Sequence, residues 1–379
     1  MKVLYFSDNT SDHNRRFLEK LSQAGLDVWF LDPTSDRLAQ NWLPPGVHWS
    51  RSRQIVPRDS DPSVFAGFLP EFQDCLQAIR PDLVHAGPTH NCGYVTALSN
   101  FHPWLLTSWG SDVLYQADQG PAWKQATQHA LSSADGFLFD CDAVRAKAKQ
   151  LALVPDSRIV QFPWGIRKGS FTPEGPLLEE EVFTPEPGTC VLVSTRSWEP
   201  LYGIDVLLEA FRRAHRVDSL LQLLLLGDGS QAVQVREFIA THGLERAVRT
   251  PGQIVKRDMP KWFRVADVYV SCAKSDGTSV SLLEAMATGL PAVVTDIPSN
   301  REWIVNAENG WLASPCSAEE FAEQFLQAAR LGAGQKRLIS QRNRLIVEQR
   351  ADWDRNFPRL VEMYEQLTAY AATTGRNQG

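Results

Sequence analysis

The chain has 379 residues, of which 43% are hydrophobic and 22% are charged, and its formal net charge is −6. This composition is that of a soluble globular protein, and the length predicts two domains. The acidic balance argues against a general nucleic-acid binder, and no stretch approaches the roughly 20 apolar residues that cross a bilayer.

The first part of the chain alternates predicted strands with predicted helices. The strands are predicted at 2–6, 27–31, 83–86, 104–108, 136–140 and 159–162. The helices are predicted at 13–24, 63–79, 92–100, 119–133 and 142–151. Regular alternation of this kind indicates a parallel α/β sheet with helices on its faces.

A linker is predicted at 166–189, where proline, glycine and acidic residues interrupt the pattern. The alternation then restarts, with strands at 190–194, 220–226, 267–271 and 291–295 and helices at 204–214, 231–242 and 259–265. We therefore predict an N-terminal domain at 1–165 and a C-terminal domain at 190–350. An amphipathic period at about 353–370 predicts a last helix, and the small, polar residues 371–379 predict a frayed end.

The loop after the strand at 267–271 carries two acids eight residues apart, Asp276 and Glu284. Four residues after the first acid can bring backbone N–H groups close to an anion at the start of a helix: Gly277, Thr278, Ser279 and Val280. This loop lies at the carboxyl end of a strand, where parallel sheets bind ligands. Glu284 falls one turn into the helix and can reach sugar hydroxyls. For an isolated Asp, a simple helix cap is the alternative interpretation.

This segment resembles the signature of the family-four glycosyltransferases of the GT-B fold. That signature is a Glu, seven residues, a second Glu, then Ala-Met-Ala, Gly and Pro, and the match continues at 295–296, 300–302 and 309–310. Asp276 stands where the family has the first Glu. The resemblance implies an α/β fold of two Rossmann-like domains that face a cleft, with a C-terminal helix crossing back to the N-terminal domain.

The resemblance also implies further donor-binding residues. Arg196 follows the strand at 190–194 and matches the family's diphosphate-binding Arg, although a surface Arg paired with Glu199 is the alternative. Tyr202 stands where the family carries a Lys, so a cation is missing, and Lys274 is a possible substitute. The family further places the donor near two glycine turns, here Gly227 and Gly252.

In the N-terminal domain, Asp112 matches the Asp of the family's His-Gly-x-Asp pattern. Trp109 replaces the His of that pattern, so it cannot act as a titrating base and is predicted to stack on a sugar or nucleotide. His13 and Arg15, after the first strand, are predicted to contact the acceptor. His85 resembles a His at a strand end in the family and is assigned to the acceptor too, with a buried structural His as the alternative.

These residues predict a retaining glycosyltransferase that moves a sugar from a nucleotide diphosphate sugar to a hydroxyl acceptor. The catalytic residues are predicted to be Asp112, Arg196 and Asp276. The resemblance implies no metal and no cofactor besides the nucleotide sugar, and Asp140-Cys141-Asp142 is interpreted as a strand end and helix start rather than a metal site.

Two alternatives stay open at this point. They are a degenerate binder of nucleotide sugars and a nucleotide-sugar 2-epimerase of the same fold. An NAD-dependent dehydrogenase requires a complete glycine motif after the first strand, which this sequence lacks.

The predicted location is the cytoplasm. Six cysteines without a Cys-x-x-Cys pair predict free thiols, and the apolar start is too short for a signal peptide. The acceptor is predicted to be a saccharide, a lipid-linked molecule or a small hydroxyl compound. A lipid-linked acceptor would place the protein at the inner face of the membrane. The basic cluster of Arg51, Arg53 and Arg58 is a weak indication of such a contact.

Overall fold

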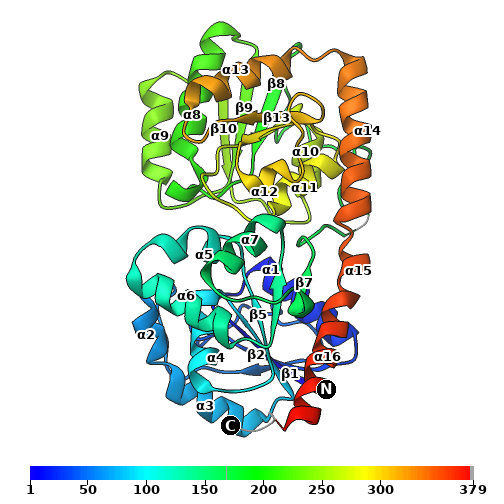
Figure 1. Cartoon of the computed structure of the whole chain (residues 1–379). Coiled ribbons are helices and arrows are strands. Elements are labelled where there is room, and N and C mark those ends of the chain that lie inside the picture. The colour runs from blue at the N-terminus through cyan, green and yellow to red at the C-terminus, as the bar shows by residue number, and fades with distance from the viewer. Residues whose placement is uncertain (168, 376–379) are drawn as a thin grey trace. The chain divides into compact units, whose positions relative to one another are not determined.

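A computed structural model describes residues 1–167 and 169–375. The chain forms two compact units (Figure 1). Unit 1 comprises Met1–Trp164 together with the chain from Asp354 onward, and unit 2 comprises Gly165–Trp353. Among the described residues, 166–189 contain neither a helix nor a named strand. No helix in the described part of the chain has both the length and the apolar character needed to cross a membrane.

Unit 1 contains a sheet of seven parallel strands in the order β3-β2-β1-β4-β5-β6-β7. The strands are β1 (Lys2–Ser7), β2 (Asp27–Leu31), β3 (Val47–Ser50), β4 (Leu83–Gly87), β5 (Trp104–Thr107), β6 (Gly136–Phe139) and β7 (Ile159–Gln161). Six of them were predicted to within one residue at each end. The sequence analysis missed β3, because a four-residue edge strand with polar positions gives no clear apolar alternation.

The helices of unit 1 before its last strand are α1 (Asp12–Gln23), α2 (Pro62–Ala66), α3 (Leu69–Ile79), α4 (Tyr94–Ser99), α5 (Ser111–Leu114), α6 (Pro121–Ser133) and α7 (Asp142–Leu151). The single helix predicted at 63–79 is wrong, because the chain breaks at Gly67 and restarts with Pro70 in the first turn of α3. The helix predicted at 92–100 begins instead as a π-helical turn, η1 (Thr89–Gly93), followed by α4.

The C-terminal segment returns to unit 1, as the resemblance implies. The predicted helix at 353–370 is divided into α15 (Trp353–Asn356) and α16 (Pro358–Thr374). Leu367 of α16 lies against Gly136 of β6, where a Cβ atom would come within 2.7 Å of the leucine side chain. The prediction of a frayed end from 371 is wrong up to Thr374, which is helical, and 376–379 lie outside the described residues.

Unit 2 contains a sheet of six parallel strands in the order β10-β9-β8-β11-β12-β13. The strands are β8 (Cys190–Ser194), β9 (Leu221–Leu226), β10 (Val248–Gly252), β11 (Val268–Ser271), β12 (Ala292–Thr295) and β13 (Gly310–Ala313). The helices are α8 (Ile204–Val217), α9 (Ala232–Thr241), α10 (Met259–Arg264), α11 (Val280–Ala287), α12 (Pro298–Arg301), α13 (Ala318–Ala329) and α14 (Ala333–Arg350).

Each sheet has a point where the strand order reverses. In unit 1 the chain builds outward from β1 to β3 and then restarts beside β1 with β4; in unit 2 it does the same with β8 and β11. Open parallel sheets bind ligands at the carboxyl ends of the strands that flank such a switch point. A ligand site is therefore expected at the residues after β1 and β4, and at those after β8 and β11.

Candidate functional site

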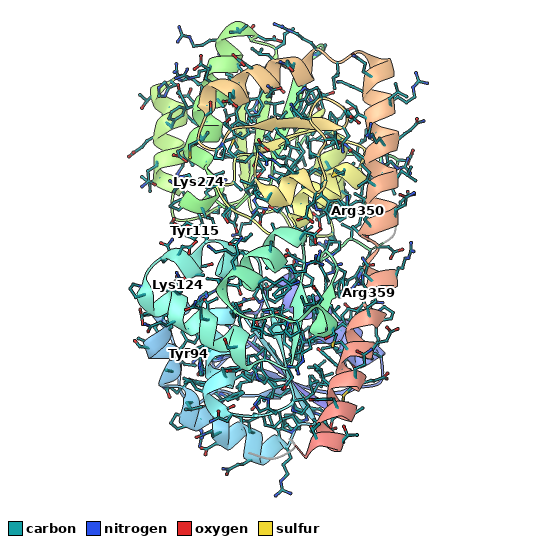
Figure 2. The ribbon with its side chains drawn as sticks, viewed as in Figure 1. Tyr94, Tyr115, Lys124, Lys274, Arg350 and Arg359 are labelled. Atoms are coloured by element: carbon teal, nitrogen blue, oxygen red, sulfur yellow. The ribbon has the colours of Figure 1, made fainter. Side chains whose placement is uncertain are left out.

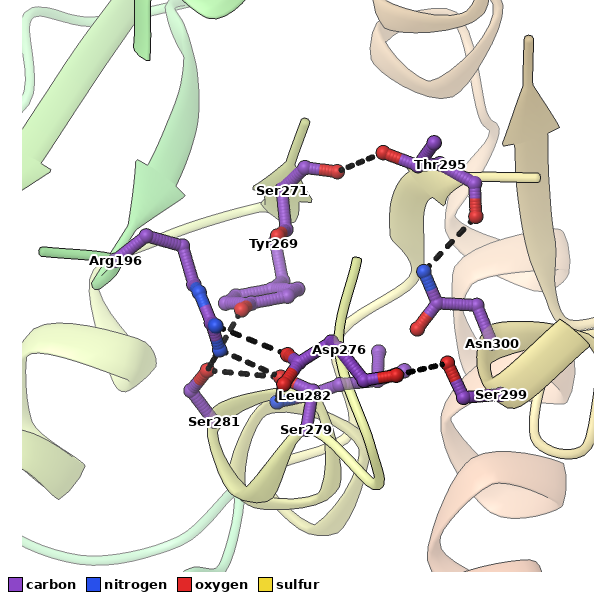
Figure 3. A network of polar contacts seen from close by, with 10 residues as sticks. All are labelled: Arg196, Tyr269, Ser271, Asp276, Ser279, Ser281, Leu282, Thr295, Ser299 and Asn300. Carbon is purple, nitrogen blue, oxygen red and sulfur yellow. Dashed lines mark hydrogen bonds and ion pairs between the residues drawn. The ribbon is translucent and has the colours of Figure 1, made fainter. Parts of the chain in front are cut away.

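The loops after β8 and β11 bring Arg196 and Asp276 together at the switch point of unit 2 (Figure 3). Arg196 Nη2 lies 2.9 Å from Asp276 Oδ2, and the two side chains are 11% and 19% exposed. The alternative pairing of Arg196 with Glu199 is wrong, because Glu199 accepts a hydrogen bond from the backbone N–H of Ser230 at 2.8 Å.

The same guanidinium reaches the N-terminus of α11. Arg196 Nη1 donates to Ser279 Oγ at 3.0 Å and to Ser281 Oγ at 3.4 Å, and Ser281 Oγ also lies 2.8 Å from the Tyr269 hydroxyl (Figure 3). Ser279 is the N-cap of α11 and accepts from the backbone N–H of Leu282. A fixed cation and the first-turn amides of a helix therefore lie side by side, which is an arrangement that suits a phosphate.

The charges of this pair are set by burial and by each other. Burial raises the pKa of Asp276 above its usual range, while the Arg196 charge acts in the opposite direction. Burial alone would lower the pKa of Arg196, but the Asp276 carboxylate raises it, so the guanidinium stays protonated at any ordinary pH. Arg196 Nε is buried without a hydrogen-bond partner among the described residues.

The backbone of this loop is held by α12. The Ser299 hydroxyl donates to the carbonyl of Asp276 at 2.8 Å, and Asn300 Nδ2 donates to the carbonyl of Thr295 at 2.8 Å (Figure 3). Ser299 thus holds the loop, whereas Asn300, within the family match at 300–302, joins α12 to the end of β12.

Tyr202, which stands where the family has a Lys, packs against Arg196. The Arg196 guanidinium carbon lies 4.1 Å from the centroid of the Tyr202 ring, which is a cation–π contact. The next residue, Gly203, has φ +62° and lies so close to β11 that a Cβ atom would be 2.2 Å from the carbonyl oxygen of Cys272. Tyr202 therefore orients the cation that remains instead of supplying a second one.

The other predicted donor residues of unit 2 differ in their contacts and in their exposure. Gly227 N donates to the carbonyl of Gly252 at 2.9 Å, so the two glycine turns are joined to each other. Thr278 is buried within the loop. Lys274, the predicted substitute cation, has an exposed side chain (Figure 2), and its backbone N–H donates to the carbonyl of Leu201 at 2.9 Å.

Glu284, the second acid of the motif, is 3% exposed in the middle of α11. Its Oε1 forms an ion pair with the ammonium of Lys256, from the loop between β10 and α10. The sequence analysis did not find Lys256, because nothing in a stretch 28 residues away links this lysine to the acid.

In unit 1, Asp112 lies in the first turn of α5 and is 1% exposed. Its Oδ2 accepts from the backbone N–H of Thr89 at 2.8 Å and from the Thr89 hydroxyl at 2.7 Å, and its Oδ1 accepts from the Ser108 hydroxyl at 2.6 Å. Both carboxylate oxygens are thus engaged by the protein. In this geometry Asp112 holds together the turns that follow β4 and β5.

His13 and Trp109 lie near each other, whereas Arg15 is turned away. The rings of His13 and Trp109 have centroids 6.3 Å apart, and Trp109 also packs edge-on against Phe17 and Trp164. Arg15 Nε donates to the carbonyl of Trp42 at 2.8 Å, which gives it a structural contact. The acceptor residues predicted as one group are therefore reduced to the half-buried pair of His13 and Trp109.

His85 has the structural role that was the alternative interpretation. It is 1% exposed, and its ring nitrogens contact the hydroxyls of Tyr364 on α16 and Thr107 on β5. Burial lowers the pKa of His85 to about 3, so the ring is neutral. The predicted acceptor contact through His85 is not supported, because the side chain joins the sheet to the last helix.

Two further predictions concern a metal and a membrane. Asp140 is buried directly after β6, and Asp142 opens α7. In the described part of the chain no three metal-ligating side chains cluster. In the basic cluster, Arg53 pairs with Asp74 at 2.6 Å and Arg51 with Asp36 at 3.3 Å.

Comparison with known proteins agrees with this geometry. Residues 180–346 match the family described as glycosyl transferases group 1, and residues 2–141 match the family described as glycosyl transferase 4-like. Between them the two models match most of the chain. The chain belongs to the glycosyl transferases that these two models describe. The predicted family and fold class are thereby confirmed.

The chain is 28% identical over 172 residues to D-inositol 3-phosphate glycosyltransferase of Pseudarthrobacter chlorophenolicus. The match covers 44% of this chain and 41% of that relative, so the chain spans less than half of the curated relative's length. Sucrose-phosphate synthase from Thermosynechococcus elongatus has the same fold, with a TM-score of 0.84 and 17% identity over 98% of this chain and 100% of that one. HepE of Anabaena, solved in complex with UDP, gives a TM-score of 0.76 and 16% identity over 97% and 100%.

The chain also has polar residues at the switch point of unit 1 that the sequence analysis missed. Asp8, directly after β1, accepts from Asn91 Nδ2 at 2.8 Å, and burial raises the pKa of Asp8. His90, beside Asn91, is buried, and burial lowers its pKa to about 4 although the Asp112 charge opposes that change. Only the strand order could have shown them, since β1 and β4 are far apart in the sequence.

Proposed function

We propose that this chain transfers a sugar from a nucleotide diphosphate sugar to a hydroxyl acceptor and retains the configuration at the anomeric carbon. The single observation that carries the proposal is the Arg196 guanidinium, held by Asp276 and Ser279 beside the N-terminus of α11. Negative charge grows on the diphosphate as the glycosidic bond loosens. A cation that is already in place stabilises that charge without reorganisation.

The remaining donor contacts follow from the same loop. The amides around Thr278 and Ser279 would bind the diphosphate, Asp276 the hydroxyls of the donor sugar, and Glu284 the ribose hydroxyls. The glycine turns at Gly227 and Gly252 would approach the nucleotide. A uridine nucleotide is the first candidate, because HepE of Anabaena, which shares the fold, was solved with UDP.

Retention is supported by what unit 1 offers. In a same-face transfer the departing diphosphate oxygen takes the proton of the acceptor hydroxyl, so no separate base is required. Trp109 has no titrating group, and both oxygens of Asp112 already accept hydrogen bonds. Asp112 would act as a positioning residue that keeps the turn with Trp109 in place, while His13 and Trp109 would contact the acceptor.

The acceptor would be a saccharide, a lipid-linked molecule or a small hydroxyl compound in the synthesis of a polysaccharide, glycolipid or other glycoconjugate. The protein would work in the cytoplasm, and a lipid-linked acceptor would bring it to the inner face of the membrane. The arginine cluster gives this contact little support, because Arg51 and Arg53 already pair with acids of unit 1.

A thermal-shift screen with UDP-, GDP- and ADP-sugars tests the proposal, since a ligand at a hundred times its Kd stabilises the folded state by about 2.7 kcal/mol. One donor is expected to raise the melting temperature, and Glu284→Ala is expected to abolish that increase. Glu308→Ala, which removes a half-exposed acid of unit 2 paired with Arg342, is the matched control. An unchanged shift in Glu284→Ala would contradict the assigned site, and a wild-type protein that responds to no donor would contradict the function.

Activity then separates catalysis from binding. Tyr202 and Trp109, which replace a charged and a titrating residue of the family, favour a second candidate, a non-catalytic binder of nucleotide sugars. A purified protein that binds the donor but neither transfers nor hydrolyses the sugar would establish that candidate. Product analysis by NMR of the anomeric proton decides the stereochemistry, and an inverted product would exclude the retaining mechanism.

A further inference from the structure

Glu284 has a cationic partner that the motif does not contain. The ammonium of Lys256 contacts Glu284 Oε1, and it also lies 5.6 Å from the centroid of the Phe171 ring. The Lys256 side chain is 46% exposed, whereas the Glu284 side chain is almost completely buried. The lysine thus reaches inward from the loop after β10 to an acid on α11.

This contact matters because of the burial of Glu284. A carboxylate that is removed from water favours its neutral form unless a cation or hydrogen-bond donors compensate for the lost hydration. Only the ionised carboxylate presents both oxygens as acceptors, which is what two adjacent hydroxyls of a ribose require. A cation on one edge of the carboxylate therefore favours the form that binds a diol.

Lys256 also lies apart from Arg196, the cation that is assigned to the diphosphate. Arg196 contacts Asp276 and Ser279 at the start of α11, while Lys256 contacts Glu284, five residues after Ser279 on the same helix. The two acids of the motif are each paired with a different cation. Asp276 lies before the first turn of α11, and Glu284 lies within the helix. A role for Lys256 in the nucleoside part of the donor fits this placement better than a role at the phosphates.

We propose that Lys256 is a positioning residue for nucleotide recognition, whose ammonium keeps Glu284 ionised and oriented to accept hydrogen bonds from the ribose hydroxyls. The inference rests on the proposed function, which assigns the ribose to Glu284. It adds a residue that is outside the two-acid motif and determines how strongly a ribonucleotide is preferred over its deoxy counterpart.

The experiment compares the affinity of UDP with that of 2′,3′-dideoxy-UDP by calorimetry, with the GDP and ADP pairs tested in parallel. Lys256→Met is expected to weaken UDP about tenfold, a coupling common for residues in contact, and to weaken the dideoxy nucleotide less than about threefold. Lys256→Arg keeps the charge and is expected to retain most of the UDP affinity. Lys261→Met is the matched control, because that lysine pairs with Asp258 at 3.6 Å in the same segment.

Each other outcome overturns the inference. Equal losses for UDP and the dideoxy nucleotide would place Lys256 at the phosphates, and no loss for either would make it an ordinary surface lysine. In a Glu284→Gln background, Lys256→Met should cause no further loss, and an additive loss would contradict action through Glu284. Melting temperatures without ligand identify unfolded variants, and Lys256→Gln replaces Lys256→Met if the latter does not fold. A wild-type protein that binds no nucleotide refutes the proposed function itself, which is a different result from a silent Lys256 variant.

Discussion

Asp276 in unit 2 and Asp112 in unit 1 both follow a central strand of a parallel sheet, yet their partners differ in kind. Asp276 lies 2.9 Å from the guanidinium of Arg196. Asp112 accepts hydrogen bonds from an amide and two hydroxyls of Thr89 and Ser108. A cation can be shared with a charged ligand, whereas a carboxylate saturated by neutral donors mainly holds its own loops in place.

Two other buried acids lie directly after strands of unit 1, Asp8 after β1 and Asp32 after β2. Burial raises the pKa of Asp8, and it raises the pKa of Asp32, directly after β2, to about 6. In unit 2, Glu284 is also buried but is paired with Lys256. Unit 2 is therefore built to use charge at its site, and unit 1 to use shape and neutral hydrogen bonds.

The largest effect is expected for Arg196→Ala. Removing a preorganised charge from a site where charge develops costs about 10³-fold in rate, or about 4 kcal/mol. Transfer kinetics measured at saturating donor would show it as a loss of kcat. Arg213→Ala, which removes a half-exposed arginine of α8, should leave the rate unchanged. A loss below about threefold in Arg196→Ala would mean that charge does not distinguish the site of unit 2.

Asp32→Asn tests the buried acids of unit 1. Because the pKa of Asp32 is about 6 in the folded protein and about 4 in the unfolded chain, its stabilising contribution is complete below pH 4 and is lost as the pH rises through 6. The variant should therefore melt at the same temperature as wild type near pH 4 and at a higher temperature at pH 8. The gain has an upper bound of about 3 kcal/mol. Thermal unfolding at both pH values, with the exposed Asp59→Asn as control, would contradict this if the difference did not change with pH.

Asp112→Ala should act on stability before chemistry. It leaves an amide and two hydroxyls without their acceptor, at a cost of about 2 kcal/mol, whereas Asp112→Asn keeps part of the bonding. Urea unfolding followed by tryptophan fluorescence measures the cost. Donor-induced thermal shifts should be retained in both variants, since the donor loop belongs to unit 2. Loss of kcat in Asp112→Asn without loss of stability would show that Asp112 takes a direct part in the reaction. It would then contradict the contrast drawn between Asp112 and Asp276.

The smallest effect is expected at Tyr202. Its ring supports the Arg196 guanidinium, and such a contact contributes about 1 kcal/mol, so Tyr202→Leu should weaken donor binding about fivefold. Tyr202→Phe keeps the ring and should bind as wild type does. Calorimetric titration with the donor nucleotide compares the two variants. Equal losses in both would assign the effect to the Tyr202 hydroxyl instead.

The residue order alone predicted much of this molecule. Apolar runs of four to six residues between helical periods located six of the seven strands of unit 1, and the motif at 276–284 located the loop of the candidate site. Prediction from the sequence failed where the local signal for an element or a break was weak. The edge strand β3 was missed because it lacks apolar alternation, and the break between α2 and α3 was missed because Gly67 lies within an otherwise helical stretch.

The functional assignments divide in the same way. Arg196, Asp276 and Ser279 were named from a pattern of neighbours, and the structure brings them into contact. His85 was assigned to the acceptor because it lies at the end of a strand. That position does not show whether the side chain points outward or into the core. Its contact with Tyr364, 279 residues away, depends on where the last helix packs.

The sequence by itself determined most of the elements, the glycosyltransferase family and the two acids of the candidate site, because these depend on residues close together in the chain. Tertiary structure decided which charges meet: Lys256 with Glu284, Arg196 with Asp276, and Thr89 with Asp112. Each of these contacts joins loops from different strands or helices. Their distances are set by the order of strands in a parallel sheet, which local sequence patterns do not encode.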